Sequence, residues 1–395
     1  MQKTARIRSI DIMRGMTLFL MLFVNDLFIP GVPEWLVHTQ ADFDGMGLAD
    51  WVFPGFLFIV GMSVPYAVNS RLQEGQSKTL IFGHIVLRTL SLLIIGLLMM
   101  NADRLNPELS GISKSIWAVL MYLSVFLIWN NYPPNEKYKK FFIVLKFSGI
   151  IGLVILVIMF RAGVPENILW LETGWWGILG LIGWGYFTAA SLHLLIGSRL
   201  YATFLLWLFF VGLNILSQLG ILEIVDFLNP VFGIIISGTV PSTVLAGLCV
   251  SIFLKQTSFK PGNITGIITI CGIICIALGF LLRNWFIISK IQGTPSWVLI
   301  CSGISMILFS ALYLIIDIGG REKWASFFKP AGRNSLTTYL APDILYYLFL
   351  GLSIPLFFYK QGNSQLLAVG GSLAWAIAMV GFAAVLEKIN IRLKL

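Results

Sequence analysis

The sequence predicts an all-α, polytopic bundle of membrane helices. Of its 395 residues, 57% are hydrophobic and only 11% are charged, and the mean hydropathy is +0.88. Soluble domains carry about 25% charged residues, so the bilayer is the main solvent of this chain. The apolar runs are long and do not alternate with polar residues. They therefore favour helices, which satisfy their own backbone hydrogen bonds in lipid.

Twelve apolar runs are long enough, or nearly so, for a helix of roughly 20 residues that crosses the hydrocarbon. The run at 177–220 is interrupted only by Gly197-Ser198-Arg199, and the run at 114–130 is short, so ten or eleven helices would also fit. The expected spans are about 9–29, 50–69, 80–100, 114–130, 141–160, 177–197, 201–220, 232–254, 263–283, 297–317, 334–350 and 366–386.

The loops between these runs are short, at most about 20 residues, so we expect residues 1–395 to form one transmembrane domain without a soluble domain. The basic start precedes an apolar run, as in a signal peptide. No small-residue cleavage site follows, and Asn25-Asp26 interrupts the run. We therefore expect a retained first helix.

The basic residues alternate between the two sides of the predicted membrane. Twenty of the 27 lysines and arginines fall on the side of the N-terminus, six on the other side, and Arg14 lies within the first span. The positive-inside rule then places both termini in the cytoplasm. His38 would face the other side, which is the periplasmic side of a bacterial inner membrane. The net charge of +9 follows this topology and does not indicate a nucleic-acid partner.

The cysteines indicate neither a metal site nor a disulfide framework. Cys249, Cys271, Cys275 and Cys301 all fall within apolar runs and lack metal-ligand spacing. We interpret them as small buried residues and expect no metal cofactor.

His38 is the leading candidate for chemistry. It is one of three histidines and the only one in a carboxylate-rich loop at a membrane surface. Histidine can act as base and acid near neutral pH. Asp42 or Asp44 would orient its ring, although the same contact would also suit a purely structural loop histidine. Asn25 either ends the first helix or points an amide donor at an oxyanion near His38.

The other two histidines and the first helix support plainer interpretations. His84 opens the third span and suits a headgroup contact, and His193 suits packing or capping near a helix end. Asp11 and Arg14 share one helix face. They form either a local ion pair or, with Arg14 turned inward, part of an anion-binding cavity on the cytoplasmic side.

Several later patches are unusually polar for membrane spans. Small residues and hydroxyls there allow close helix packing, and the cavity interpretation is the alternative. Asp343, directly after Pro342, is a carboxylate well inside the membrane. The candidates for lining such a cavity, or for the side where the acceptor of a transferred group would bind, are Asp42, Asp44, Asp50, Thr239, Ser242, Ser296, Trp297, Asn334, Ser335 and Asp343.

In this order, the patches resemble the heparan-α-glucosaminide N-acetyltransferase family of transmembrane acyltransferases. The match over residues 6–65 is specific, and the later marks are short. Pro342-Asp343 stands where that family has His-Glu, and two helices at about 177–220 look additional. The matching segments are Arg8-Ser9-Ile10-Asp11-Ile12-Met13-Arg14-Gly15, Asn25, His38, Gly47-Leu48-Ala49-Asp50-Trp51-Val52-Phe53-Pro54, Phe58-Ile59-Val60-Gly61, Gly238-Thr239 with Ser242, Ser296-Trp297 and Asn334-Ser335.

The resemblance implies transfer of acetyl from cytoplasmic acetyl-CoA to an amino sugar or glycan on the far side, with His38 and Asn25 essential. His38 would act as a general base or carry the acetyl group itself. A secondary transporter of a small polar solute and a membrane O-acyltransferase are the competing functions. Homodimerisation stays open. The coenzyme A phosphates would lie among Arg6, Arg8, Arg14, Arg88 and Arg333.

Overall fold

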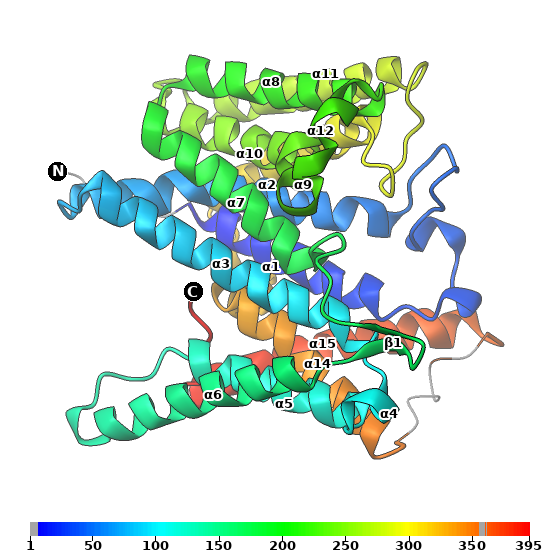
Figure 1. Cartoon of the computed structure of the whole chain (residues 1–395). Coiled ribbons are helices and arrows are strands. Elements are labelled where there is room, and N and C mark those ends of the chain that lie inside the picture. The colour runs from blue at the N-terminus through cyan, green and yellow to red at the C-terminus, as the bar shows by residue number, and fades with distance from the viewer. Residues whose placement is uncertain (1–6, 355–359, 361) are drawn as a thin grey trace.

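The computed structural model describes residues 7–354, 360 and 362–395, so Arg6 lies outside the described residues. The chain folds into a bundle of helices, which confirms the all-α prediction (Figure 1). The strands found in this described part, β1 (Ala162–Val164) and β2 (Asn167–Leu169), form one short antiparallel pair.

Each of the twelve predicted spans coincides with helical structure. Nine stretches of the described residues are long and apolar enough to cross a membrane. The chain is therefore an integral, multi-pass membrane protein. The long helices are α1 (Arg8–Asn25), α2 (Leu48–Gln73), α3 (Lys78–Ala102), α5 (Lys114–Trp129), α6 (Lys139–Met159), α7 (Gly177–Ile196), α8 (Leu200–Gln218), α10 (Thr239–Gln256), α11 (Pro261–Leu282), α12 (Pro295–Leu312), α14 (Ser335–Gly351) and α15 (Gln365–Lys388); the short ones are α4 (Pro107–Ser110), α9 (Asn229–Ile236) and α13 (Lys329–Arg333).

The predicted span 232–254 is not one continuous helix. It consists of α9 and α10, separated at Ser237-Gly238. Gly238 adopts a φ of +70°, and an added Cβ would lie 2.3 Å from the carbonyl oxygen of Phe210 in α8. Only glycine fits this left-handed position against a neighbouring backbone. The break places Thr239, the first residue of α10, in contact with α8 and with the loop before α12.

Helix α1 lies at the centre of the bundle. It contacts α2 and α12 on one side and α13, α14 and α15 on the other. Figure 1 shows α5, α6, α14 and α15 grouped on one side of α1, and α2, α7, α8, α10, α11 and α12 on the other side. Helix α3 packs mainly on α7 and also touches α5. Side chains of α1 therefore face both groups of helices.

Close backbone contacts between α2 and α10 depend on two glycines. A Cβ on Gly61 would lie 1.8 Å from the carbonyl oxygen of Val244, and a Cβ on Gly247 would lie 1.9 Å from that of Phe58. Small residues are what allow helices to approach this closely in a membrane. The contact fixes α2, whose two ends carry the groups described below.

The beginning of α1 is held by the end of α12. Residues Tyr313–Ile318 continue α12 as a π-helix, and Asp317 lies in this segment. Its carboxylate accepts hydrogen bonds from the backbone amides of Arg8 and Ser9 at 2.8 and 3.0 Å. The first amides of a helix lack partners within the helix, and a carboxylate there also complements the helix dipole.

Candidate active site

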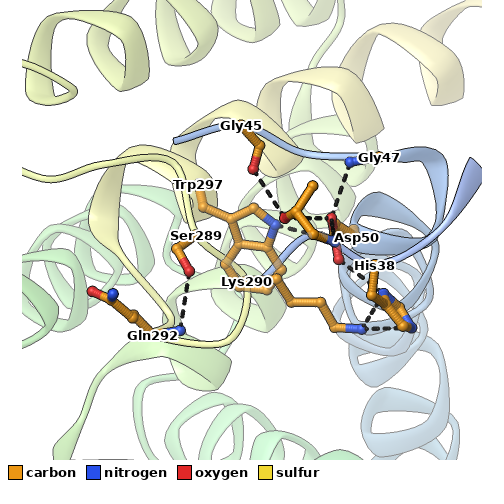
Figure 2. Close-up of polar contacts among 9 residues, drawn as sticks. His38, Gly45, Gly47, Asp50, Ser289, Lys290, Gln292 and Trp297 are labelled. Carbon is orange, nitrogen blue, oxygen red and sulfur yellow. Dashed lines mark hydrogen bonds and ion pairs between the residues drawn. The ribbon is translucent and has the colours of Figure 1, made fainter. Parts of the chain in front are cut away.

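His38 is bound by Asp50 at the start of α2. His38 Nδ1 lies 2.8 Å from Asp50 Oδ1 (Figure 2). The other oxygen, Oδ2, accepts from the backbone amides of Thr39 and Gly47 at 3.1 and 3.0 Å and from the Thr39 hydroxyl at 3.1 Å. Asp50 is fully buried. The expectation that Asp42 or Asp44 orients His38 is therefore wrong.

This arrangement determines which nitrogen of the His38 ring carries the proton. An ionised carboxylate only accepts hydrogen bonds, so in the neutral ring Nδ1 carries the proton and donates it to Asp50. Nε2 is then left as the basic nitrogen. The His38 side chain is 42% exposed. A carboxylate behind a partly exposed imidazole is the arrangement that orients a general base.

Asp44 instead ties the His38 loop to the segment between α11 and α12. Its carboxylate accepts from the amide of Ile288 at 2.8 Å and pairs with Arg283 at 2.8 Å. These two contacts hold the pKa of Asp44 below its usual value of 3.8. Asp42 is exposed at the tip of the same loop. The two carboxylates that the sequence placed beside His38 therefore do not orient it in this structure.

The polar patch before α12 supports the same loop. Trp297 Nε1 donates to the backbone oxygen of Asp50 at 3.2 Å. Ser296 Oγ donates to the carbonyl of Ile287 at 2.8 Å. Ser296 is fully buried and Trp297 nearly so. Both residues therefore position the segment that faces His38 rather than lining an open cavity.

Thr239 and Ser242 have comparable structural partners. Asn214 of α8 donates to Thr239 Oγ1 and to the carbonyl of Gly293, both at 2.9 Å. Thr239 also donates to Gly293 at 3.1 Å, and Ser242 donates to the Thr239 carbonyl at 2.9 Å. These contacts join α8, α10 and the loop before α12.

Lys290 belongs to the site and was missed by the sequence reasoning. Its Nζ lies 3.0 Å from His38 Nδ1 and 3.2 Å from Nε2 (Figure 2). Burial lowers the pKa of the Lys290 ammonium below 10.5, although Asp50 acts in the opposite direction. Lys290 follows His38 by 252 positions, and no local pattern in the sequence pairs them.

Asn25 is the last residue of α1 and is exposed. Its neighbour Asp26 is buried and pairs with Lys360 at 3.2 Å. Among the described residues, no hydrogen bond joins Asn25 to His38 or to its loop. The structure therefore places both residues at the same end of the bundle without a hydrogen bond between them among the described residues.

A basic cavity of about 380 Å³ opens at the other end of α2. Arg14, Arg88 and Arg333, which the sequence assigned to an anion site, all line it. Arg14 also pairs with Asp11 at 3.3 Å and donates to the carbonyl of Gly332 at 3.2 Å. Arg14 therefore forms the local ion pair and lines the cavity at the same time, and anion binding there stays a prediction. Arg88 stacks on the Tyr186 ring at 4.6 Å.

Arg71 and Lys394 also line the cavity, and the sequence reasoning had not selected them for this site. Arg8 does not line it, because its side chain pairs with Glu322 at 3.1 Å. Deeper in, the walls become apolar, with contributions from α7, one of the two helices that looked additional. These inner residues are Leu18, Met21, Phe56, Val60, Leu92, Ile178, Leu179 and Ile182.

Helix α2 separates this cavity from His38. Of the α2 residues that line the cavity, Phe56 is the closest in sequence to Asp50. It lies six residues, or about 9 Å of helix rise, beyond Asp50, and it projects about 120° away around the helix axis. Trp51, Val52 and Phe53 lie between them and are buried.

The polar candidates within α14, and Asn334 directly before it, divide between two surroundings. Ser335 lines the basic cavity, whereas Asn334 is buried beside it. Asp343 accepts a hydrogen bond from Tyr122 of α5 and does not line the cavity. The candidates of this helix therefore do not converge on His38.

Comparisons with known proteins agree with the resemblance carried by residues 6–65. The heparan-alpha-glucosaminide N-acetyltransferase of Mus musculus is 27% identical over 374 residues, which covers 86% of this chain and 54% of that protein. The Homo sapiens protein of the same name is 38% identical over 120 residues, which covers 30% of this chain and 18% of that protein. The chain thus spans about half the length of the mouse protein.

A family model described as "Domain of unknown function (DUF5009)" matches residues 6–210. The match includes the His38 loop, the cavity-lining part of α7 and the first half of α8. The matched region thus runs through α7 and ends within α8. Since the match covers more than half of the sequence, the chain belongs to the DUF5009 family.

Proposed function

We propose that the protein is a membrane acetyltransferase that takes acetyl from acetyl-CoA at the basic cavity and delivers it to an amino sugar on the side of His38. The observation that carries the proposal is the cavity, which has a basic mouth and an apolar interior at the end of α2 opposite the His38–Asp50 pair. The names of the relatives agree with an acetyltransferase.

The donor fits the distribution of charge in the cavity. Coenzyme A has phosphates at one end and a thin, less polar arm that ends in the thioester. The phosphates would bind among Arg71, Arg88 and Arg333, since guanidinium groups bind phosphate oxygens in a bidentate manner. The arm would follow the apolar wall toward Met21 and Phe56.

His38 would supply the base for the transfer. Nε2 removes a proton from the acceptor amine while the amine nitrogen attacks the acetyl carbonyl carbon. The carbon–sulfur bond then breaks, and the protonated ring returns the proton to the coenzyme A thiolate. Asp50 keeps the ring in the tautomer that this step requires.

The charge distribution along the chain supports the proposed sidedness. The basic mouth would face the cytoplasm, where acetyl-CoA is made, and His38 would face the opposite compartment. Since α2 separates the two sites, the donor arm reaches His38 only after α2 or the helices beside it move. Substrate binding is the natural trigger for such a movement.

The test uses the purified protein in lipid nanodiscs. Acetyl-CoA should raise the melting temperature, and labelled acetyl should pass to members of a panel of amino sugars. His38→Ala should keep the stabilisation by acetyl-CoA and lose about two to four powers of ten in transfer rate.

Two results would overturn the proposal. One is no stabilisation by acetyl-CoA together with stabilisation by free sugars, which is the behaviour of a transporter. The other is wild-type turnover in His38→Ala. Mass spectrometry of protein incubated with acetyl-CoA alone separates the two chemistries, because a relay leaves acetyl on His38 and direct transfer does not.

A further inference from the structure

The position of Lys290 over the His38 ring has no counterpart in the mechanism above. The Nζ atom lies almost equally far from both ring nitrogens, at 3.0 and 3.2 Å (Figure 2). The lone pairs of the two nitrogens point away from each other in the ring plane. One ammonium therefore cannot form linear hydrogen bonds to both nitrogens. It lies across the ring instead, with N–H donors left for another acceptor.

Lys290 is held in place by its backbone and by its neighbours. Ser289 is fully buried, and its hydroxyl donates to the carbonyl of Ala41 in the His38 loop at 2.9 Å. The Gln292 side chain donates to the same carbonyl at 2.8 Å. Gly293, at a φ of +65°, donates its amide to the Lys290 carbonyl at 3.0 Å. Contacts between the His38 loop and the loop before α12 thus fix the backbone position of Lys290.

A structural ion pair does not account for this lysine. Within the described part of the chain, Lys290 forms no salt bridge with a carboxylate. The Asp50 oxygens accept from His38, Thr39 and Gly47 instead. Holding a cation in a partly buried position is costly unless it is paired. Here the cation contacts the group that we assign as the base.

We propose that the Lys290 ammonium binds the acetyl carbonyl oxygen and stabilises the oxyanion that forms when the amine attacks. This inference rests on the proposed function. Any acceptor nitrogen close enough to give its proton to His38 Nε2 would bring the adjacent carbonyl oxygen within reach of Nζ. Such a group near both the base and an oxyanion donor is what acyl transfer needs.

Lys290 thereby takes the role that the sequence suggested for Asn25. As the C–N bond forms, the carbonyl electron pair moves onto oxygen beside the ammonium. It returns when the C–S bond breaks, and the thiolate leaves with the proton from His38. The ammonium gains and loses no proton in this cycle, so its contribution is electrostatic.

The experiment compares Lys290→Met and Lys290→Arg with the wild type and with Lys114→Met. Lys114 is a matched control, because its ammonium donates to the backbone oxygen of Asp103 and contacts no residue of the His38 site. Transfer rates and acetyl-CoA affinity are measured in nanodiscs. Lys290→Met should lose about 10²–10³ in kcat, with acetyl-CoA affinity within about twofold of wild type.

A second positively charged side chain at position 290 tests whether the charge of Lys290 is what matters for the transfer rate. Lys290→Arg should recover at least tenfold over Lys290→Met, whereas Lys114→Met should match the wild type. Melting temperatures separate catalysis from folding, since removal of a partly buried cation should not lower the melting temperature of Lys290→Met. If that variant does not fold, Lys290→Gln, which keeps a polar end, replaces it.

The experiment distinguishes failure of the Lys290 inference from failure of the proposed function. If the wild type transfers no acetyl to any acceptor, the proposed function is at fault. If the wild type is active and Lys290→Met matches it, the Lys290 inference is wrong. It is also wrong if Lys290→Met raises only KM, or if it loses stability and rate together and Lys290→Arg restores neither.

Discussion

Asp50 holds His38 and the loop around it with the two oxygens of one carboxylate. One oxygen meets the imidazole at 2.8 Å, and the other accepts from the backbones of Thr39 and Gly47. The orientation of the ring and the shape of the loop therefore depend on the same buried group. A change at Asp50 should affect catalysis more than donor binding, because the part of α2 that lines the basic cavity begins at Phe56, six residues further along the helix.

Asp50→Asn is expected to lower acetyl transfer by roughly 10²–10⁴-fold. An amide that keeps its oxygen toward the loop amides turns its NH₂ toward His38, and the ring then has to accept at Nδ1 and loses the base at Nε2. Acetyl-CoA binding should stay within about twofold of wild type. Single-turnover kinetics and calorimetry measure the two quantities, and a parallel loss of affinity would argue against the separation of the sites.

Arg71→Gln is expected to weaken acetyl-CoA binding about tenfold or more, since a charge-assisted hydrogen bond contributes roughly 1.5–3 kcal/mol. Arg8→Gln is the matched control, because Arg8 pairs with Glu322 and does not line the cavity. Titration with acetyl-CoA in nanodiscs measures both variants. Equal losses in the two variants would mean that bulk charge, and not this cavity, attracts the donor.

The sequence predicted the helices more completely than it predicted the candidate site. Hydropathy acts on each segment by itself, so all twelve spans coincide with helical structure. The break at Gly238 was missed because it depends on close contact with the backbone of α8. Local composition cannot show a contact with a helix that lies elsewhere in the chain.

The site was predicted in part. Arg14, Arg88 and Arg333 do share a cavity, because the alternation of charge places them at one end of the helices. The sequence did not select Asp50 as the partner of His38 from among three nearby carboxylates. That choice depends on the turn at Gly47 and on Ile288 and Arg283, which occupy Asp44.

Gly61→Ala is expected to destabilise the protein by about 1–3 kcal/mol, because the new methyl group overlaps the Val244 carbonyl and forces α2 and α10 apart. Gly83→Ala in α3 is the control, since no heavy atom lies within 4 Å of its added Cβ. Thermal unfolding in detergent compares them. If Gly61→Ala melts at the same temperature as Gly83→Ala, the close contact does not limit stability.

The Asp44 tether should depend on pH. The Ile288 amide and Arg283 lower the pKa of Asp44, so the folded state favours the ionised carboxylate. Its stabilising effect is fully present above 3.8 and is lost as pH falls through the lower pKa of the folded state. The melting-temperature difference between wild type and Asp44→Asn should be constant at about pH 5–7 and shrink below about pH 4. A difference that persists at the lowest pH would contradict this assignment.

Sidedness can be tested with single cysteines in a background without the four native ones. Gln40→Cys lies in the His38 loop and Lys78→Cys at the start of α3, and both positions are exposed. An impermeant thiol reagent added outside intact cells should label Gln40→Cys and spare Lys78→Cys. The reverse pattern would place the basic cavity on the outer side of the membrane, where cytoplasmic acetyl-CoA could not bind to it.

The buried stretch Trp51, Val52 and Phe53 between the cavity and His38 has a consequence for the cell as well as for the reaction. A continuous aqueous path as wide as the cavity would let protons and ions flow down their gradients whenever no substrate was bound. Apolar side chains that exclude water block such a current. On the proposed function, a two-carbon group would pass between compartments while the membrane stays electrically insulated, and the energy stored across it would not be dissipated.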